Sequence, residues 1–188
     1  MSENTAEYMQ KVKKATKILF YKRHRQPGVK GWELKRALGG HYLKIIDLLN
    51  QQLNNLDLQV KIVYETPDQV RDPTAEEFEK ARYYVTLKGS LRLSDMVMAG
   101  WRIDDVAILV AAIAYIISKQ GKSQRSEVES MLCEKFPKYR VDYCLNRFIR
   151  MAYLGQDDAG VLYLNWRARA EIDQKSLLRL IMGEELTS

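Results

Sequence analysis

The residue types that carry out acid–base, nucleophilic or metal chemistry are scarce in this chain. Of its two histidines, His24 lies in a basic stretch and His41 follows Gly39-Gly40, and neither has an acid or a cysteine close to it in sequence. The sequence contains no metal-ligand spacing, glycine-rich phosphate loop or nucleophile elbow. We therefore expect a protein that is not an enzyme and that uses no metal and no cofactor.

Two cysteines, Cys133 and Cys144, lie eleven residues apart in stretches that read as successive helices. Two thiols exclude a disulfide scaffold and any four-cysteine metal site. Free cysteines without such a motif usually pack as small apolar residues. We expect both thiols to be buried and the protein to work in a reducing compartment, the cytoplasm or the nucleoid.

Basic side chains are concentrated in one segment. Residues 11–44 hold eleven lysines and arginines against one acid, Glu33, which is a charge of +10 in a chain of net charge +6. Such a region attracts polyanions through electrostatic steering and counterion release, although a solvated helix face is the alternative. We predict weakly specific or nonspecific DNA contact by its basic residues. They are Lys11, Lys13, Lys14, Lys17, Lys22, Arg23, Arg25, Lys30, Lys35, Arg36 and Lys44.

A second candidate surface lies on the helix predicted for Lys138–Ala152. At 100° per residue, its apolar positions gather on one face and a polar stripe lies well away from them. That stripe consists of Arg140, Tyr143, Arg147 and Arg150. An exposed arginine stripe on the third helix of a helix-turn-helix predicts contact with DNA phosphates or base edges. A solvated face is again the alternative, and Asp142 reduces the local charge.

The first half of the chain reads as three helices followed by a β-ribbon. Apolar spacing predicts helices over 5–22, 32–38 and 41–56, and alternation predicts strands over 58–64 and 83–88. The connection 66–81 is long, acidic and interrupted by prolines, so we expect it to be mobile or to protrude. Within it, Thr74 and Glu77 have the spacing of a capping box, which indicates a helical turn.

The same order recurs in the second half. Helices are predicted from Asp104 or Asp105 to 119, from Ser123 or Ser126 to 136, and over 138–152. A hairpin around residues 157–160 and a final helix over 168–182 follow. The run 106–117 is apolar on every side, which predicts an almost wholly buried helix.

This repeated order predicts a mainly α protein with small β-ribbons, built as tandem winged helix-turn-helix domains. We assign 1–90 to a basic first domain, 91–103 to a linker and 104–188 to a second domain with a C-terminal helix. The N-terminus lacks an apolar signal region, and the longest apolar run, of 12 residues, is too short to span a bilayer. We expect no membrane association.

The second half also resembles the MAGE homology domain, the family that includes the MAGE-type subunit of eukaryotic SMC complexes. The residues that carry the resemblance are the apolar helix ending at Gly121, the Ser126–Leu132 helix, the Tyr153-Leu154 pair, and Trp166, Arg169, Ala170 and Asp173. Arg167 and Ala168 stand where the family signature has Gly-Pro, and Asp173 stands in place of the usual Glu. The resemblance implies tandem winged helices in a non-enzymatic adaptor that binds a kleisin or another partner, and sometimes DNA.

Two functions remain open from the sequence. The first is a DNA-binding protein, chromosome-associated or a transcription regulator, that uses the basic first domain. The second is a protein-interaction adaptor, kleisin-binding or SMC-complex-like, with little DNA binding of its own. A homodimer is a related alternative, because winged-helix regulators are usually two-fold symmetric. Candidates for an exposed docking patch are Tyr21, Trp32, Trp101 and Met96–Met98.

Overall fold

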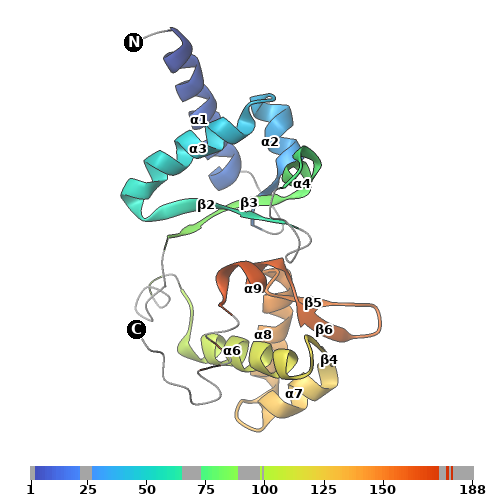
Figure 1. The fold of residues 1–188 in the computed structure, drawn as a ribbon. Coiled ribbons are helices and arrows are strands. Elements are labelled where there is room, and N and C mark those ends of the chain that lie inside the picture. The colour runs from blue at the N-terminus through green and yellow to red at the C-terminus, as the bar shows by residue number, and fades with distance from the viewer. Residues whose placement is uncertain are drawn as a thin grey trace. The chain divides into compact units, whose positions relative to one another are not determined.

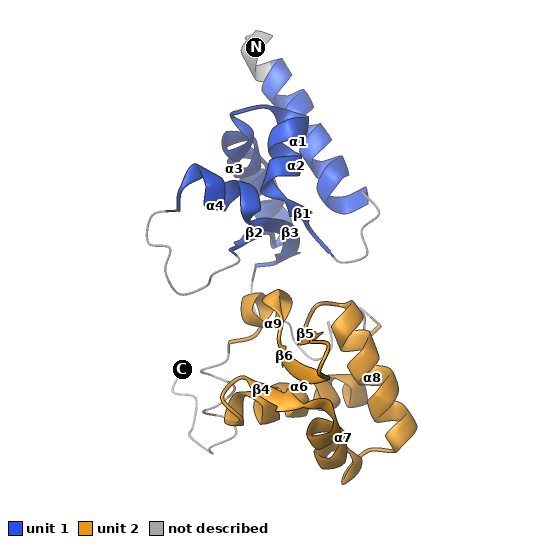
Figure 2. Cartoon of the chain, turned by 90° about the vertical axis from the view of Figure 1, so that its right-hand side faces the viewer, with its two compact units in different colours: residues 1–91 blue, residues 92–188 orange. Residues whose placement is uncertain are grey.

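The computed structural model describes residues 3–21, 27–64, 73–88, 98, 100–173, 177 and 179. The chain divides into two compact units, Met1–Leu91 and Arg92–Ser188 (Figure 2). The apolar side chains of each unit form a core of their own, one among residues between 8 and 85 and the other among residues between 101 and 177.

The first three helices of the first unit lie on one side of its β-ribbon (Figure 1). Its elements are α1 (Glu3–Tyr21), β1 (Val29–Lys30), α2 (Gly31–Leu38), α3 (Tyr42–Leu53), the short 3-10 helix η1 (Asn54–Leu56), β2 (Leu58–Val63), α4 (Ala75–Lys80) and β3 (Arg82–Leu87). Helix α3 buries the apolar stripe that its 3.6-residue period predicts, including Ile45, Ile46 and Leu49. The chain leaves η1 through Asp57 in a left-handed conformation, which turns it into β2.

The second unit repeats this arrangement. Its elements are α6 (Ile103–Ser118), β4 (Lys122–Gln124), α7 (Arg125–Cys133), α8 (Lys138–Arg150), β5 (Leu154–Gln156), β6 (Val161–Leu164) and α9 (Trp166–Glu171). The β5–β6 hairpin turns at residues 157–160, as predicted, because Asp157 Oδ1 accepts hydrogen bonds from the amides of Ala159 and Val161. Helix α9 begins two residues before the predicted start and ends at Glu171, and residues 174–176, 178 and 180–182 of the predicted 168–182 helix lie outside the described residues.

The two units have the same sheet topology. Each sheet is antiparallel, with strand orders β1-β3-β2 and β4-β6-β5. A helix, a short strand, two helices and a β-ribbon in this order form a winged helix, so the predicted mainly α, tandem winged-helix fold is confirmed. Strands β1 and β4 were not predicted, because strands of two and three residues are too short to show alternation.

Helix α6 corrects the prediction of an almost wholly buried helix. One side of it, including Ile108, Ala112 and Ile116, is fully buried in the core of the second unit. The opposite side is not, since Val110 is 37% exposed and Ala107 is also exposed. A helix that is apolar all round does not reveal from sequence which of its faces the core covers.

The connection between β2 and β3 also departs from its prediction. Its first part, through residue 72, lies outside the described residues, but α4 packs against α2. Thr74 and Glu77 form the predicted capping box, and the Phe78 ring lies edge-on to Tyr64 at 5.9 Å. The expectation that the connection is mobile or protrudes is therefore wrong for residues 73–80.

Candidate functional site

Two of the four residues of the predicted arginine stripe form ion pairs with a buried carboxylate. Asp105, in the first turn of α6, is 1% exposed and accepts hydrogen bonds from Arg140 and from Arg147 Nη1, the latter at 2.8 Å. The two arginines lie on one face of α8, two helical turns apart. The expectation that they form an exposed stripe is wrong, because they compensate a charge inside the second unit.

The Arg147 side chain also joins an aromatic cluster. Its guanidinium lies 5.0 Å from the centre of the Trp101 ring, and that ring stacks on Phe148 and meets Tyr153 edge-on. Trp101 thus packs against the core, contrary to its prediction as part of an exposed patch. Tyr21, Trp32 and Met98 are exposed, whereas Met96 and the residue after it lie outside the described residues.

The two cysteines lie in different surroundings. Cys144 is buried and its thiol contacts Asp105 Oδ1 at 3.3 Å. Burial, followed by the hydrogen bond to Asp105, raises the pKa of Cys144 to about 11. Cys133 is exposed at the end of α7, so the prediction of two buried thiols is wrong for this residue.

The outward face of α8 carries a different set of side chains. At successive turns it presents Tyr139, which is 76% exposed, Tyr143, which is 52% exposed, and then Asn146 and Arg150. Two of the predicted contact residues, Tyr143 and Arg150, therefore do lie on the surface. Tyr139 and Asn146 were not predicted. Tyr143 and Asn146 lie four and seven residues after Tyr139, a spacing that places all three on the same face.

A shallow groove of about 520 Å³ runs along this face, lined by Tyr143, Asn146, Ile149, Arg150 and Gln156. Arg125 Nη1 donates hydrogen bonds to Asn146 Oδ1 at 2.9 Å and to Gln156 Oε1 at 3.2 Å. Because their oxygens face Arg125, the two side-chain amides are held in a fixed orientation. The groove thus joins α8 to β5 in a defined geometry.

In the first unit, two of the predicted cations of α1 contact groups within the protein, and the other two are exposed. Lys11 Nζ lies 2.6 Å from Glu7 Oε1, and Lys14 Nζ donates to the backbone carbonyl of Ala37 at 2.7 Å. Lys13 and Lys17 are exposed, one turn apart on the helix. Helix α1 thus presents Lys13 and Lys17 to solvent. The Lys14 side chain is exposed as well, although its ammonium group contacts Ala37.

Three other predicted cations, Lys30, Lys35 and Arg36, contact neighbours within the unit. Lys35 Nζ lies 2.6 Å from Glu79 Oε1, and the Arg36 guanidinium lies 5.1 Å from the centre of the Trp32 ring. Lys30 Nζ donates to the carbonyl of Lys80 at 2.8 Å, and Lys44 is exposed on α3. Lys22, Arg23 and Arg25 lie outside the described residues.

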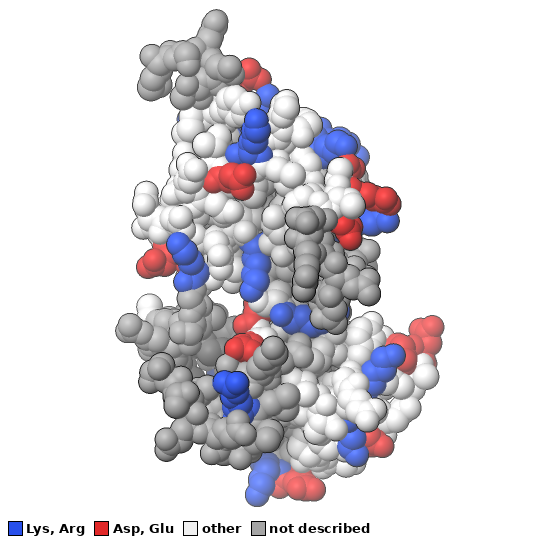
Figure 3. Space-filling model, viewed as in Figure 1, with Lys and Arg blue, Asp and Glu red and all other residues white. Residues whose placement is uncertain are grey.

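The distribution of charge on the surface follows from these contacts. On the face shown in Figure 3, several lysine and arginine side chains lie beside acidic ones instead of forming one continuous patch. The pairs Lys35–Glu79 and Lys80–Glu76 are examples within the first unit. Neighbouring acids reduce the attraction of a basic surface for a polyanion.

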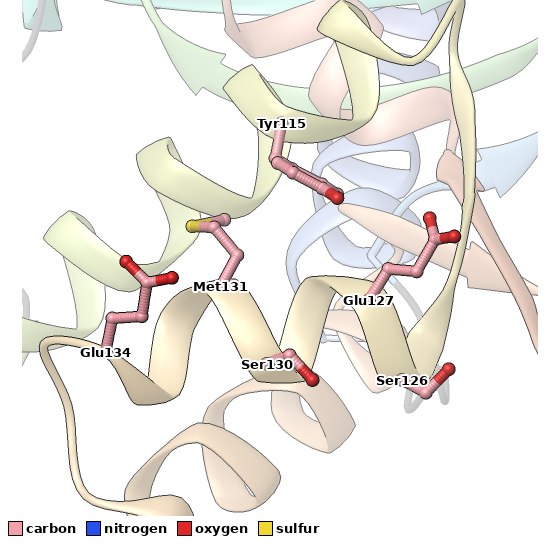
Figure 4. Close-up of a pocket in the computed structure, with 6 residues that line it drawn as sticks. All are labelled: Tyr115, Ser126, Glu127, Ser130, Met131 and Glu134. Carbon is pink, nitrogen blue, oxygen red and sulfur yellow. The ribbon is translucent and has the colours of Figure 1, made fainter.

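A second groove lies between α6 and α7, with a volume of about 480 Å³. Tyr115 from α6, Glu127 and Met131 from α7, and Glu134 just after α7 line the space between the two helices (Figure 4). Glu127 also accepts a hydrogen bond from Ser123 at 2.7 Å, and Lys119 Nζ lies 5.5 Å from the centre of the Tyr115 ring. This groove offers apolar surface with two carboxylates beside it.

Neither groove contains a constellation typical of an active site. Across the part of the chain that the structure describes, no three histidine, cysteine or acidic side chains are placed to hold a metal ion. His41 is exposed and precedes the first residue of α3, while His24 lies outside the described residues. Among the described helices, none is long and apolar enough to cross a membrane.

The comparisons with known proteins identify the fold. No protein-family model matches the chain, and no curated protein sequence matches it. A chain in the solved structure of the Nse1-Nse3-Nse4 complex is similar to it, with a TM-score of 0.63 and 16% sequence identity. The similarity covers 97% of this chain and 91% of that chain, so it includes both winged-helix units. The chain therefore has a MAGE-like fold of two winged helices in tandem.

Proposed function

We propose that this protein is a non-enzymatic protein-interaction adaptor, an SMC-complex-like subunit that binds a kleisin in a reducing compartment. The observation that carries the proposal is the similarity over nearly the whole of both chains to a member of the Nse1-Nse3-Nse4 complex. A fold by itself hosts many functions, so the proposal depends on that assembly together with the surfaces of this chain. The MAGE-type residues around Trp166 are consistent with it.

The outward face of α8 is the docking surface that we assign to this partner. In a DNA-binding winged helix, the third helix contacts the major groove with its polar and basic residues. Here Arg140 and Arg147 form ion pairs with Asp105. The outward residues of α8 include two exposed tyrosines, Tyr139 and Tyr143. Tyrosine and arginine are enriched among the residues that dominate protein–protein binding energy. A surface of Tyr139, Tyr143 and Arg150 therefore favours a protein partner over a polyphosphate.

The test is reconstitution of the full chain with the purified kleisin encoded in the same genome. We expect a complex on size-exclusion chromatography and a binding isotherm by calorimetry. Replacing both Tyr139 and Tyr143 by alanine should weaken binding about tenfold or more, since each buried tyrosine contributes on the order of 1 kcal/mol or more. Tyr21→Ala is the matched control, because Tyr21 is 85% exposed but belongs to the first unit.

Two results would contradict this proposal in different ways. The absence of any complex with the kleisin would overturn the adaptor function. A complex that binds equally well after substitution of both tyrosines, or that is weakened by Tyr21→Ala alone, would retain the function but remove α8 as its docking surface.

DNA binding by the first unit is the second candidate function. It is supported by the three exposed lysines of α1, namely Lys13, Lys14 and Lys17, within the segment of charge +10. Because Lys35 contacts Glu79 and the Arg36 guanidinium lies over the Trp32 ring, we expect a modest interaction with the DNA backbone. A salt titration of binding to random duplex DNA measures it directly.

If this candidate is correct, affinity for duplex should fall steeply as salt is added. Lys13→Glu with Lys17→Glu should lower the log–log salt slope by about 0.9 for each phosphate that the variant no longer neutralises. Arg150→Ala on α8 should leave the slope unchanged. No binding of the unchanged protein at low salt would exclude DNA as a partner without affecting the adaptor proposal.

A further inference from the structure

Helix α6 presents an apolar stripe on the side that faces away from its own core. Ile103 is 60% exposed and Val110 is 37% exposed, and Ala107 is exposed between them. Ala114 and Ile117 continue the stripe and are partly buried. At 100° per residue, all five positions fall within about 80° of one another. We call these residues, Ile103, Ala107, Val110, Ala114 and Ile117, the α6 stripe.

The stripe is unusual for the surface of a small domain. Between Val106 and Ile117 the helix has no charged residue, and Tyr115 is its only residue with a polar side chain. Single exposed apolar residues are normal, but a continuous apolar row along four turns of one helix marks a contact surface. The core of the second unit covers the other side of α6 and contacts Ile117 at the end of the stripe, but it leaves Ile103, Ala107 and Val110 exposed.

The sequence of residue types along the stripe is the same when it is read from either end of the helix, and the spacings differ by only one residue. It runs Ile, Ala, Val, Ala and Ile, with Ile103 and Ile117 each seven residues from Val110. In an antiparallel pair of such helices centred on Val110, Ile103 of one copy faces Ile117 of the other. Ala107 of one copy then lies opposite Ala114 of the other, with an offset of one residue. These small side chains permit close approach of the two backbones.

The charges beside the stripe agree with the same arrangement. Asp104 is exposed near the start of α6, and Lys119 follows its end with Nζ above the ring of Tyr115. Asp104 and Tyr115 lie on the same flank of the helix, about 20° apart. Antiparallel pairing brings Asp104 of one copy toward Lys119 of the other copy. The two-fold symmetry creates this pair of opposite charges at both ends of the contact. The opposed helix dipoles are also favourable in this orientation.

We propose that the α6 stripe is a self-association surface, on which a second copy of this chain docks antiparallel about a two-fold axis near Val110. The stripe is about 21 Å long and one helix wide. It therefore buries much less than the roughly 800 Å² per partner of a standard stable interface. The dimer is accordingly weak and depends on concentration. It uses α6 and not α8, so it does not depend on the proposed kleisin contact.

Cysteine cross-linking tests the orientation directly. In the full chain with Cys133→Ser, which removes the exposed native thiol, Val110→Cys should form a disulfide-linked dimer under mild oxidation. Ile103→Cys alone should not cross-link, whereas Ile103→Cys together with Ile117→Cys should. Cross-linking by Ile103→Cys alone as efficiently as by the pair would overturn the antiparallel geometry and the proposal with it.

Sedimentation from low-micromolar to near-millimolar concentration measures the association without chemical trapping. The unchanged chain should shift from monomer toward dimer, and Val110→Glu should remain monomeric. If Val110→Glu does not fold, Ile103→Asp replaces it, because that side chain is more exposed. Leu56→Glu is the matched control, a 68% exposed leucine in the first unit, and should dimerise normally. A chain that stays monomeric throughout, or a dimer that Val110→Glu and Ile103→Asp leave unchanged, would refute the proposal.

Discussion

At the scale of single residues, Asp105 has the largest effect on what the chain can do. It lies in the first turn of an apolar helix, at one of the two starts that the sequence predicts for that helix, but it is buried and pairs with two arginines of α8. This pairing withdraws Arg140 and Arg147 from the surface. One carboxylate thereby changes the third helix of the second unit from a basic surface into a largely aromatic and polar one.

Asp105→Asn should lower the free energy of unfolding by about 3 kcal/mol, because removing one member of a buried charge cluster leaves the others uncompensated. Chemical denaturation of the full chain measures this change. Asp104→Asn is the control, since its side chain is 56% exposed and lies 3.6 Å from Arg102 in a surface pair. Equal effects of the two substitutions would show that the cluster contributes little.

The Cys144 thiol should resist alkylation at neutral pH while Cys133 reacts. Burial and the hydrogen bond to Asp105 raise the pKa of Cys144 to about 11 from its usual 9.0, so the folded protein holds a neutral thiol. Between these two pH values the unfolded chain has released a proton that the folded protein keeps. The stabilising contribution is therefore complete below about pH 9 and disappears as the pH rises toward 11. Iodoacetamide labelling with peptide mass spectrometry, repeated across this range, measures the reactivity of each thiol.

At the scale of elements, the contact between α2 and α4 sets the structure of the first unit's wing. Gly31 begins α2, and its amide donates to the carbonyl of Ala81 at 2.9 Å. A Cβ atom on Gly31 would lie 2.0 Å from the backbone carbonyl oxygen of Phe78. The second half of the wing connection, which contains α4, is thus packed against α2. The acidic, proline-containing sequence of the connection did not predict this packing.

Gly31→Ala should destabilise the first unit by about 1–3 kcal/mol, because the added methyl group meets backbone and not a flexible side chain. Gly40→Ala is the matched control, since a Cβ at Gly40 has no atom within 4 Å. Thermal unfolding followed by circular dichroism compares the two. A melting temperature for Gly31→Ala that equals that of Gly40→Ala would show that α4 is displaced without cost.

At the scale of the whole molecule, two separate cores imply two units of separate stability. The residues of one hydrophobic core lie between 8 and 85 and those of the other between 101 and 177. Regions that share no core open as distinct cooperative units. A docking surface on one unit therefore tolerates changes in the other.

Hydrogen exchange should show this separation directly. Asp105→Asn should accelerate amide exchange in α6 and α8 and leave α1 and α3 unchanged, whereas Gly31→Ala should do the reverse. The measurement is exchange of the full-length variants followed by peptide mass spectrometry. Acceleration in both units by either variant would show that they unfold as one.

The sequence by itself determined the fold and the order of its elements apart from the short strands β1 and β4, because helical spacing, strand alternation and turn residues are local. The α3 stripe, the Thr74–Glu77 capping box and the hairpin at residues 157–160 all follow from neighbours within a few positions. It also located Tyr143 and Arg150 on the outward face of α8. The resemblance to the MAGE homology domain agreed with the fold that the whole-chain comparison shows.

Only the tertiary structure decided which charges and apolar faces remain available. Arg140 and Arg147 are 35 and 42 residues from Asp105 in sequence, so their pairing depends on how α6 and α8 pack. The exposed side of α6 depends likewise on which of its apolar faces meets the core. A local pattern specifies the type of an element, whereas exposure and charge compensation result from contacts between residues distant in sequence.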